Sequence, residues 1–126
     1  MKQKILLWIW CFPQMLTGLI VKRVTKAECR GDHYWFTIKR GSVSLGEYIF
    51  LCPSHYGNRK TLRHEKGHTK QSRMLGWLYI PVIALPSMLW ALYYSKHYEK
   101  LAEKGVSYYS FYTEKWADKL AGIKRN

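Results

Sequence analysis

Two long stretches of the chain carry no charged residue, and the other features of the sequence are arranged around them. They cover residues 5–21 and 75–94, so every Lys, Arg, Asp and Glu lies outside them. A helix over residues 5–21 would be about 26 Å long, close to the roughly 30 Å hydrocarbon core of a bilayer. This pattern predicts a retained N-terminal anchor helix, kinked at Pro13.

Short runs rich in aromatic and β-branched residues predict strands in the middle of the chain. Residues 34–38 and 47–51 have this composition, and glycines lie between them. Residues 42–45 fit a third strand or a bulge. We therefore expect a small antiparallel ribbon in this region.

A polar helix is predicted over residues 61–74, before the second apolar stretch. Asn58 or Thr61 is placed to cap its N-terminus, and Gly76 is placed to end it. Such a helix lies between the predicted ribbon and the second apolar stretch. It also carries the residues with the clearest chemistry in the chain, described below.

Two prolines, Pro81 and Pro86, divide the second apolar stretch. Proline is well tolerated only in the first turn of a helix, so we expect a helix that starts near one of them rather than one unbroken rod. A final helix is expected to reach Ala121, with Gly122 as its C-terminal stop.

The excess of Lys and Arg gives a formal net charge of +13, which attracts either nucleic acid or an anionic membrane surface. Basic clusters flank both apolar stretches, as is typical of membrane proteins. Nucleic-acid binding has only the charge in its favour, because the sequence shows no RNA-binding, zinc-finger or helix-turn-helix pattern. We therefore expect membrane lipids as a partner. The three cysteines form no CxxC pair, which argues against a disulfide framework.

The residues His64, Glu65 and His68 form an H-E-x-x-H motif inside the predicted 61–74 helix. Side chains four residues apart lie on one helical face, so both imidazoles can bind one Zn²⁺ while Glu65 lies next to a metal-bound water. The alternative interpretation is a solvated basic helix with two surface histidines. A catalytic zinc also needs a third protein ligand.

Spacing alone leaves the third ligand open. The longer H-E-x-x-H-x-x-G-x-x-H form is excluded, because Gln71 and Met74 occupy its last two fixed positions. Glu114 and Asp118 stand out, since they lie one turn apart on the last predicted helix, where one carboxylate can bind the metal and the other can orient a histidine. The other candidates are His33, Glu47, His55, His97, Glu99 and Glu103.

The pattern His64-Glu65-x-x-His68 followed by Glu114-x-x-x-Asp118 resembles the gluzincin zinc metallopeptidases, which include thermolysin and very small single-domain relatives. Stretches within residues 33–122 are also similar to small uncharacterised bacterial membrane proteins. The resemblance implies that His64, His68 and Glu114 bind Zn²⁺. It also implies that Glu65 is the general base and that Asp118 is the partner of a ligand histidine.

Two features depart from the gluzincin pattern. Lys66 lies within the motif, where an aromatic residue is usual, and the 45 residues between His68 and Glu114 make a longer gap than in thermolysin-like enzymes. The apolar stretch fills that gap.

Together these observations predict an α+β fold that is mostly helical, with a small antiparallel ribbon. The resemblance implies a minimal gluzincin-like zincin domain with hydrophobic, membrane-associated helices. Residues 1–32 would form the anchor helix and a basic connector. Residues 33–126 would form the zincin domain, with the apolar segment 75–94 embedded in it.

The reaction that the resemblance implies is hydrolysis of a bond in a peptide or protein substrate. Zn²⁺ lowers the pKa of its bound water to about 7, and Glu65 takes up the proton. An extended substrate would add to the ribbon beside Leu45, Gly46, Glu47 and Tyr48. Spacing assigns no transition-state stabiliser, and the candidates are Tyr108, Tyr109, Tyr112 and His97.

A zinc site of this kind constrains the second apolar stretch. If residues 75–94 crossed a bilayer once, His68 and Glu114 would lie on opposite sides and could not share a metal. A helix from Pro81 to Tyr94 would be about 21 Å long, shorter than the roughly 30 Å core, so an in-plane or re-entrant course is expected. Twelve of the 21 cations lie within residues 22–73, which by the positive-inside tendency places the catalytic face on the cytoplasmic side of a bacterial inner membrane.

A different class of function fits the same features. A small basic membrane protein could bind a metal through its H-E-x-x-H helix without catalysis, or bind an anionic partner. The sequence sets no oligomeric state.

Overall fold

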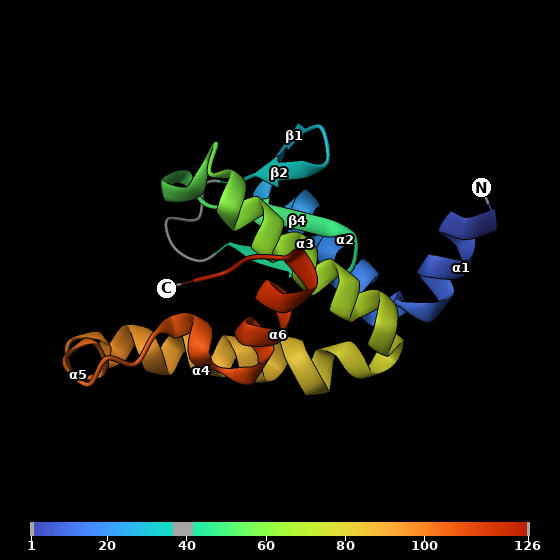
Figure 1. Ribbon diagram of the computed structural model, residues 1–126. Coiled ribbons are helices and arrows are strands. Elements are labelled where there is room, and N and C mark those ends of the chain that lie inside the picture. The colour runs from blue at the N-terminus through green and yellow to red at the C-terminus, as the bar shows by residue number, and fades with distance from the viewer. Residues whose placement is uncertain (1, 37–41, 126) are drawn as a thin grey trace.

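The computed structural model describes residues 2–36 and 42–125 of the chain (Figure 1). It confirms an α+β fold that is mostly helical and has one small sheet. The helices are α1 (Lys2–Trp10), α2 (Phe12–Thr25), α3 (Arg59–Leu75), α4 (Leu85–Lys96), α5 (Tyr98–Glu103) and α6 (Tyr112–Ala121). The strands are β1 (Glu28–Arg30), β2 (His33–Trp35), β3 (Val43–Leu45) and β4 (Tyr48–Leu51).

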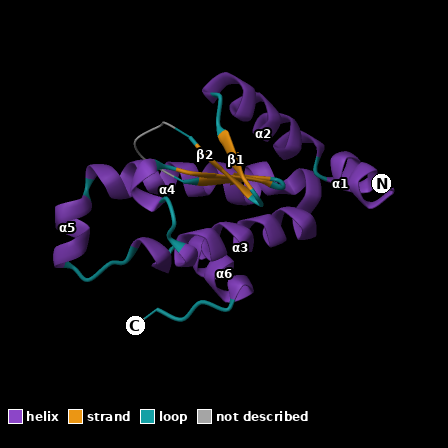
Figure 2. Cartoon of the chain, turned by 90° about the horizontal axis from the view of Figure 1, so that it is seen from above, coloured by secondary structure: helices purple, strands orange, loops and turns teal. Residues whose placement is uncertain are grey.

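The elements form layers on both sides of the sheet. Helices α2 and α3 pack against strands β3 and β4 from opposite sides, which Figure 2 shows from above. Helix α6 packs against α3, and α4 packs against α6 (Figure 1). The face of α3 that points toward α6 is therefore covered by that helix.

The N-terminal apolar stretch folds into two helices. Cys11 leaves helical geometry between them, with φ −111° and ψ 28°, and Pro13 lies in the first turn of α2. Proline fits a first turn because the N–H that it lacks has no helical partner there. The break expected near Pro13 is therefore confirmed. Within the described ranges, no helix combines the length and the apolar character that a membrane crossing needs, so the predicted transmembrane helix is not found there.

The sheet is mixed, which corrects the predicted antiparallel ribbon. Its strand order is β1-β2-β4-β3, in which β2 runs parallel to β4 and the other two pairs are antiparallel. The β3–β4 turn contains Gly46 at φ 65°, and β2 pairs with the opposite edge of β4. Because the chain reverses before β3 and again before β4, β2 and β4 run in the same direction. The end of the strand expected over residues 34–38 lies outside the described residues.

Helix α3 begins and ends at the capping residues that the sequence indicates. The Asn58 side chain accepts a hydrogen bond of 3.1 Å from the Thr61 N–H and so caps α3. At the other end, Gly76 adopts a φ of 57°, a region that favours glycine. A π-helical segment over Ile80–Ala84, with Pro81 in its first turn, runs directly into α4, so the helical course begins near Pro81 and not at Pro86.

Helices α3 and α6 come into backbone contact at Gly67. A Cβ atom on Gly67 would lie 2.1 Å from the Ala117 carbonyl oxygen, so a larger residue would have to displace α6. Arg63 and Lys70 of α3 each donate a hydrogen bond of 3.0 Å to a carbonyl in the last turn of α6. These carbonyls have no partner within their own helix, and a cation beside them is favourable. One close contact and two caps thus hold α6 on α3.

We expect Gly67→Ala to lower the free energy of unfolding by about 1–3 kcal/mol, because displacing α6 outweighs the roughly 1 kcal/mol that alanine gains in a helix. Urea unfolding followed by circular dichroism measures the change. Lys60→Ala, at an exposed position of the same helix, is the control and should change stability by less than about 0.5 kcal/mol. A Gly67→Ala protein as stable as the native one would contradict the close contact.

Candidate metal centre

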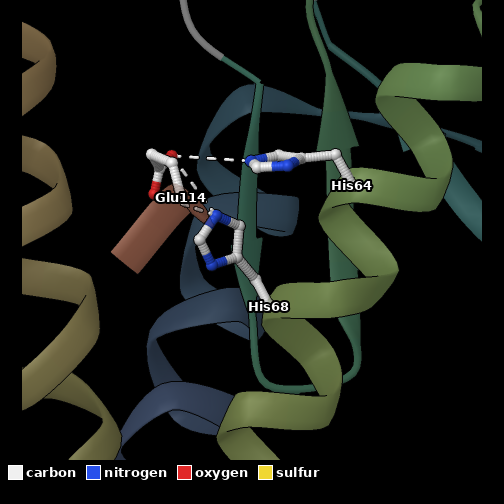
Figure 3. Close-up of side chains that lie close together, drawn as sticks. All are labelled: His64, His68 and Glu114. Atoms are coloured by element: carbon white, nitrogen blue, oxygen red, sulfur yellow. Dashed lines mark hydrogen bonds and ion pairs between the residues drawn. The ribbon is translucent and has the colours of Figure 1, made fainter. Parts of the chain in front are cut away.

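Three buried side chains converge between α3 and α6, as Figure 3 shows. His64 and His68 lie one turn apart on α3, and Glu114 lies in the first turn of α6. One ligand atom from each residue can be chosen so that all three lie within 4.8 Å of one another. The Nε2 atoms of His64 and His68 are 3.5 and 3.3 Å from the Glu114 carboxylate oxygens. Of the third-ligand candidates, the structure brings Glu114 to the histidines.

Each histidine is oriented by a hydrogen-bond acceptor at its other ring nitrogen. His64 Nδ1 lies 2.7 Å from Asp118 Oδ1, and His68 Nδ1 lies 2.7 Å from Gln71 Oε1. An acceptor at Nδ1 keeps the proton there and leaves the Nε2 lone pair free, which is the arrangement of metal-binding histidines. Asp118 therefore lies where the resemblance placed it, beside a ligand histidine. Gln71 was not predicted in this role.

The charges of the centre favour a cation between these side chains. Burial raises the pKa of Glu114, but hydrogen bonds and attraction from His64 and His68 outweigh it and hold that pKa well below its ordinary range. Burial lowers the pKa of His68, but hydrogen bonding and attraction to Glu114 outweigh it and raise the pKa to about 9. A positive charge is thus already favoured on His68, at the position where a metal would bind.

Among the described residues, three buried side-chain polar atoms have no hydrogen-bond partner. Two belong to the H-E-x-x-H motif, Nε2 of His64 and Oε2 of Glu65, and the third is Oε1 of Gln14, away from the centre. Burial raises the pKa of Glu65. An unpaired buried polar atom costs about 1–3 kcal/mol, and a bound cation with its water would give Nε2 of His64 and Oε2 of Glu65 a partner. Two imidazole nitrogens and a carboxylate are a ligand set of catalytic zinc, and the residues present therefore fit Zn²⁺.

Further hydrogen bonds hold the Glu114 carboxylate in place, and the sequence did not predict them. Ser87 Oγ of α4 and Thr113 Oγ1 donate to Glu114 Oε2 at 2.9 and 2.8 Å. Gln71 Nε2 in turn donates to the Thr113 carbonyl at 2.9 Å. Gln71 could have been found from its position three residues after His68 on a helix, whereas no local signal points to Ser87. The centre therefore uses side chains from α3, α4 and α6.

The segment after α6 returns to the centre through Arg125. Its guanidinium donates hydrogen bonds of 2.6 and 3.1 Å to the two Asp118 oxygens and lies 3.3 Å from the centroid of the Tyr109 ring. Burial raises the pKa of Asp118, but hydrogen bonds from Arg125 and His64 outweigh it and lower that pKa. Arg125 therefore helps to keep Asp118 ionised and oriented toward His64.

Two of the four predicted transition-state stabilisers lie at the centre. Burial, together with the nearby carboxylates of Glu114 and Glu65, raises the pKa of the Tyr108 hydroxyl above its ordinary range. The Tyr109 ring lies edge-on to the His64 ring, with centroids 5.1 Å apart. Tyr108 is the better placed of the two for a hydroxyl contact, because it interacts with Glu114 itself.

The other two predicted stabilisers lie away from the ligands. The Tyr112 side chain is exposed and donates its hydroxyl to the Val82 carbonyl. His97 follows α4, about 15 Å along the helix from Ser87, and packs on Tyr93. The structure does not bring either residue to the centre.

The residues predicted to bind substrate form the turn between β3 and β4: Leu45, Gly46, Glu47 and Tyr48. This turn packs against α2, where the Glu47 N–H lies 3.2 Å from Met15 Sδ. At the edge strand β3, the Ser44 carbonyl accepts a hydrogen bond of 3.1 Å from the Tyr79 hydroxyl. Part of the edge of β3, where an extended substrate was predicted to add, is therefore already occupied by Tyr79 of the same chain.

The remaining charged candidates point elsewhere. Lys66, the unusual residue within the motif, extends away from the ligands and pairs with Asp32. His33, Glu47 and His55 have partners of their own outside the centre. An open depression of about 750 Å³ lies beside the centre, and Tyr109, Asp118 and Arg125 are part of its lining.

Comparison with known proteins gives no match to a family model, a curated protein or a solved structure. The chemistry of the centre is therefore inferred from its own residues.

We expect Gln71→Ala to weaken zinc binding about 10–100-fold, because His68 then loses the acceptor that fixes its Nδ1 proton. Isothermal titration calorimetry with a competing chelator measures the affinity. Gln14→Ala is the matched control, since Gln14 is equally buried but bonds to Ser72 and Gly76 instead of a histidine. Equal affinity losses in both variants would contradict the role given to Gln71.

Zinc binding should release a proton near neutral pH. The pKa of His68 is about 9 in the metal-free protein, so His68 is protonated at pH 7 and must lose that proton to bind metal. We expect the affinity to rise about tenfold per pH unit between about pH 6 and 8 and to level off above about pH 9. Calorimetry in buffers of different ionisation enthalpy counts the protons released. An affinity independent of pH over that range would contradict this prediction.

Proposed function

We propose that the protein is a zinc-dependent metallopeptidase of gluzincin type that works at a membrane. The observation that carries the proposal is the convergence of His64, His68 and Glu114, with Asp118 bonded to the far side of His64. The sequence pattern alone contained this set of residues, but it left the third ligand open. The proposed domain is the minimal zincin domain of residues 33–126.

The chain's own residues suit hydrolysis of a peptide bond. When bound, zinc supplies a Lewis acid that polarises the scissile carbonyl and acidifies a water molecule. The Glu65 carboxylate accepts the proton of that water and donates it to the leaving amine, and burial raises its pKa. Gln71 and Asp118 hold the two imidazoles, and Ser87 and Thr113 hold Glu114.

We place the substrate, a peptide or protein, at a bacterial inner membrane with the catalytic face on the cytoplasmic side. The support is the distribution of charge: basic clusters border both apolar stretches, and most cations lie between them. The chain turns back after the second apolar stretch, because α6 packs against α3. This supports the same placement, since α3 and α6 then lie on the same side of the membrane.

A second candidate is metal binding without catalysis. It is favoured by the enclosure of the centre, since His64, Glu65, His68 and Glu114 are each no more than 6% exposed. A peptidase needs an open coordination position that its substrate can reach. A non-catalytic basic membrane protein that holds a metal, or binds an anionic partner, needs no such opening.

We expect Glu65→Gln to bind zinc in a 1:1 ratio and to lose at least about a hundredfold in hydrolysis, because the amide cannot accept the proton. Metal analysis and cleavage of a fluorogenic peptide library by protein in mild detergent test both points. Glu103→Gln, at an exposed position of α5, is the control and should keep full activity.

The outcome also separates the two candidates. Hydrolysis that persists in Glu65→Gln would contradict the general-base assignment. A native protein that binds zinc but cleaves no peptide would favour metal binding without catalysis. In either case Glu114→Ala should lose zinc, because only the two histidines would remain as ligands.

A further inference from the structure

A large apolar surface lies outside the metal centre. It has two halves: the outer faces of α1 and α2, and the chain from Met74 to Tyr93, which includes the outer face of α4. On α1, Ile5, Leu6 and Ile9 are each about 60% exposed, and on α4 Leu89 and Leu92 are 57% and 64% exposed. We call the two halves together the apolar surface.

The two halves join at the start of α2. The Phe12 ring stacks on the Trp77 ring at 6.2 Å, and Trp77 Nε1 donates a hydrogen bond of 2.9 Å to the Ile9 carbonyl. Trp10 Nε1 likewise bonds to the Arg73 carbonyl at 2.7 Å. The apolar surface is therefore continuous and is held in place by hydrogen bonds. Soluble monomers rarely expose large contiguous apolar patches, so a surface with this many exposed apolar side chains indicates a binding partner.

The segments that supply this surface carry charges of one sign. Residues 1–27 and 74–98 contain six Lys and Arg residues but no Asp or Glu. All eight acidic residues of the chain lie in the other segments. A second copy of the chain would meet this surface with the same positive charge. An anionic bilayer offers hydrocarbon for the apolar side chains and negative headgroups for the cations.

We propose that the apolar surface docks side-on into the interface of an anionic lipid bilayer. This inference rests on the proposed membrane function and names its partner and contact surface. It also gives the substrate class, because α4 contacts the bilayer with one face and the metal centre with the other, through Ser87 Oγ and Glu114. The centre then lies about one helix diameter, roughly 10 Å, from the lipid, where it meets peptide segments at the bilayer surface.

Sedimentation of the full chain with phosphatidylglycerol–phosphatidylcholine vesicles tests the docking. We expect binding to these vesicles at least about tenfold tighter than to pure phosphatidylcholine, and a further loss of about tenfold or more in Leu89→Glu. Ala102→Glu is the matched control, because it adds the same charge at an exposed helical position outside the apolar surface. It should bind nearly as tightly as the native chain.

Quenching of tryptophan fluorescence by brominated acyl chains locates the contact. Trp10 and Trp77 are the exposed tryptophans of the apolar surface, so Trp10→Phe/Trp77→Phe should remove most of the quenching, and Trp116→Phe, which changes a tryptophan of α6, should leave it nearly unchanged. Equal losses in Leu89→Glu and Ala102→Glu would overturn the proposal, because charge alone would then explain binding. A dimer in solution that does not bind vesicles would also overturn it, since a second copy would cover the surface.

The proposed docking and the proposed catalysis can fail separately. Glu114→Ala loses the metal ligand but keeps the apolar surface, so it should bind vesicles like the native chain. Vesicle binding without peptidase activity would be consistent with the docking proposal. Peptidase activity without vesicle binding would contradict it.

Discussion

The backbone contact between Gly67 and Ala117 is the constraint on which the candidate metal centre depends. It sets how close α6 comes to α3, and only at that distance does Glu114 reach the imidazoles of His64 and His68, which lie three residues before and one residue after Gly67. Glycine in the middle of a helix lowers helix stability by about 1 kcal/mol relative to alanine. Its place between Glu65 and His68 is explained by this packing, and not by the helix itself.

Close helix packing also explains why so many polar groups are buried here. The buried side chains of α3 include His64, Glu65, His68, Gln71 and Ser72. Burying polar groups is unfavourable unless each finds a partner, and most of these do. The two atoms without one, on His64 and Glu65, are the ones that a metal ion and its water would contact. The network is thus complete except where the proposed chemistry takes place.

Local features were predictable from the sequence, and features that depend on distant contacts were not. The cap at Asn58, the stops at Gly76 and Gly122, and the helix start near Pro81 each depend on a few neighbouring residues. The H-E-x-x-H residues were likewise found from their spacing. The mixed sheet was missed because strand direction depends on which edge of β4 is free, which no local pattern encodes. Ser87 and Arg125 were missed for the same reason, since their partners lie on other parts of the chain.

The separation of the ligands along the chain bears on how the protein folds. His68 and Glu114 are 46 residues apart, and His64 and Asp118 are 54 residues apart. Contacts of such long range form only after a large loop has closed, which slows folding and places them late in the process. The half-formed chain then exposes a helix with two free imidazoles. Zinc bound in the proposed way would therefore meet the histidines first and gain Glu114 only when α6 docks, which would couple zinc supply to folding.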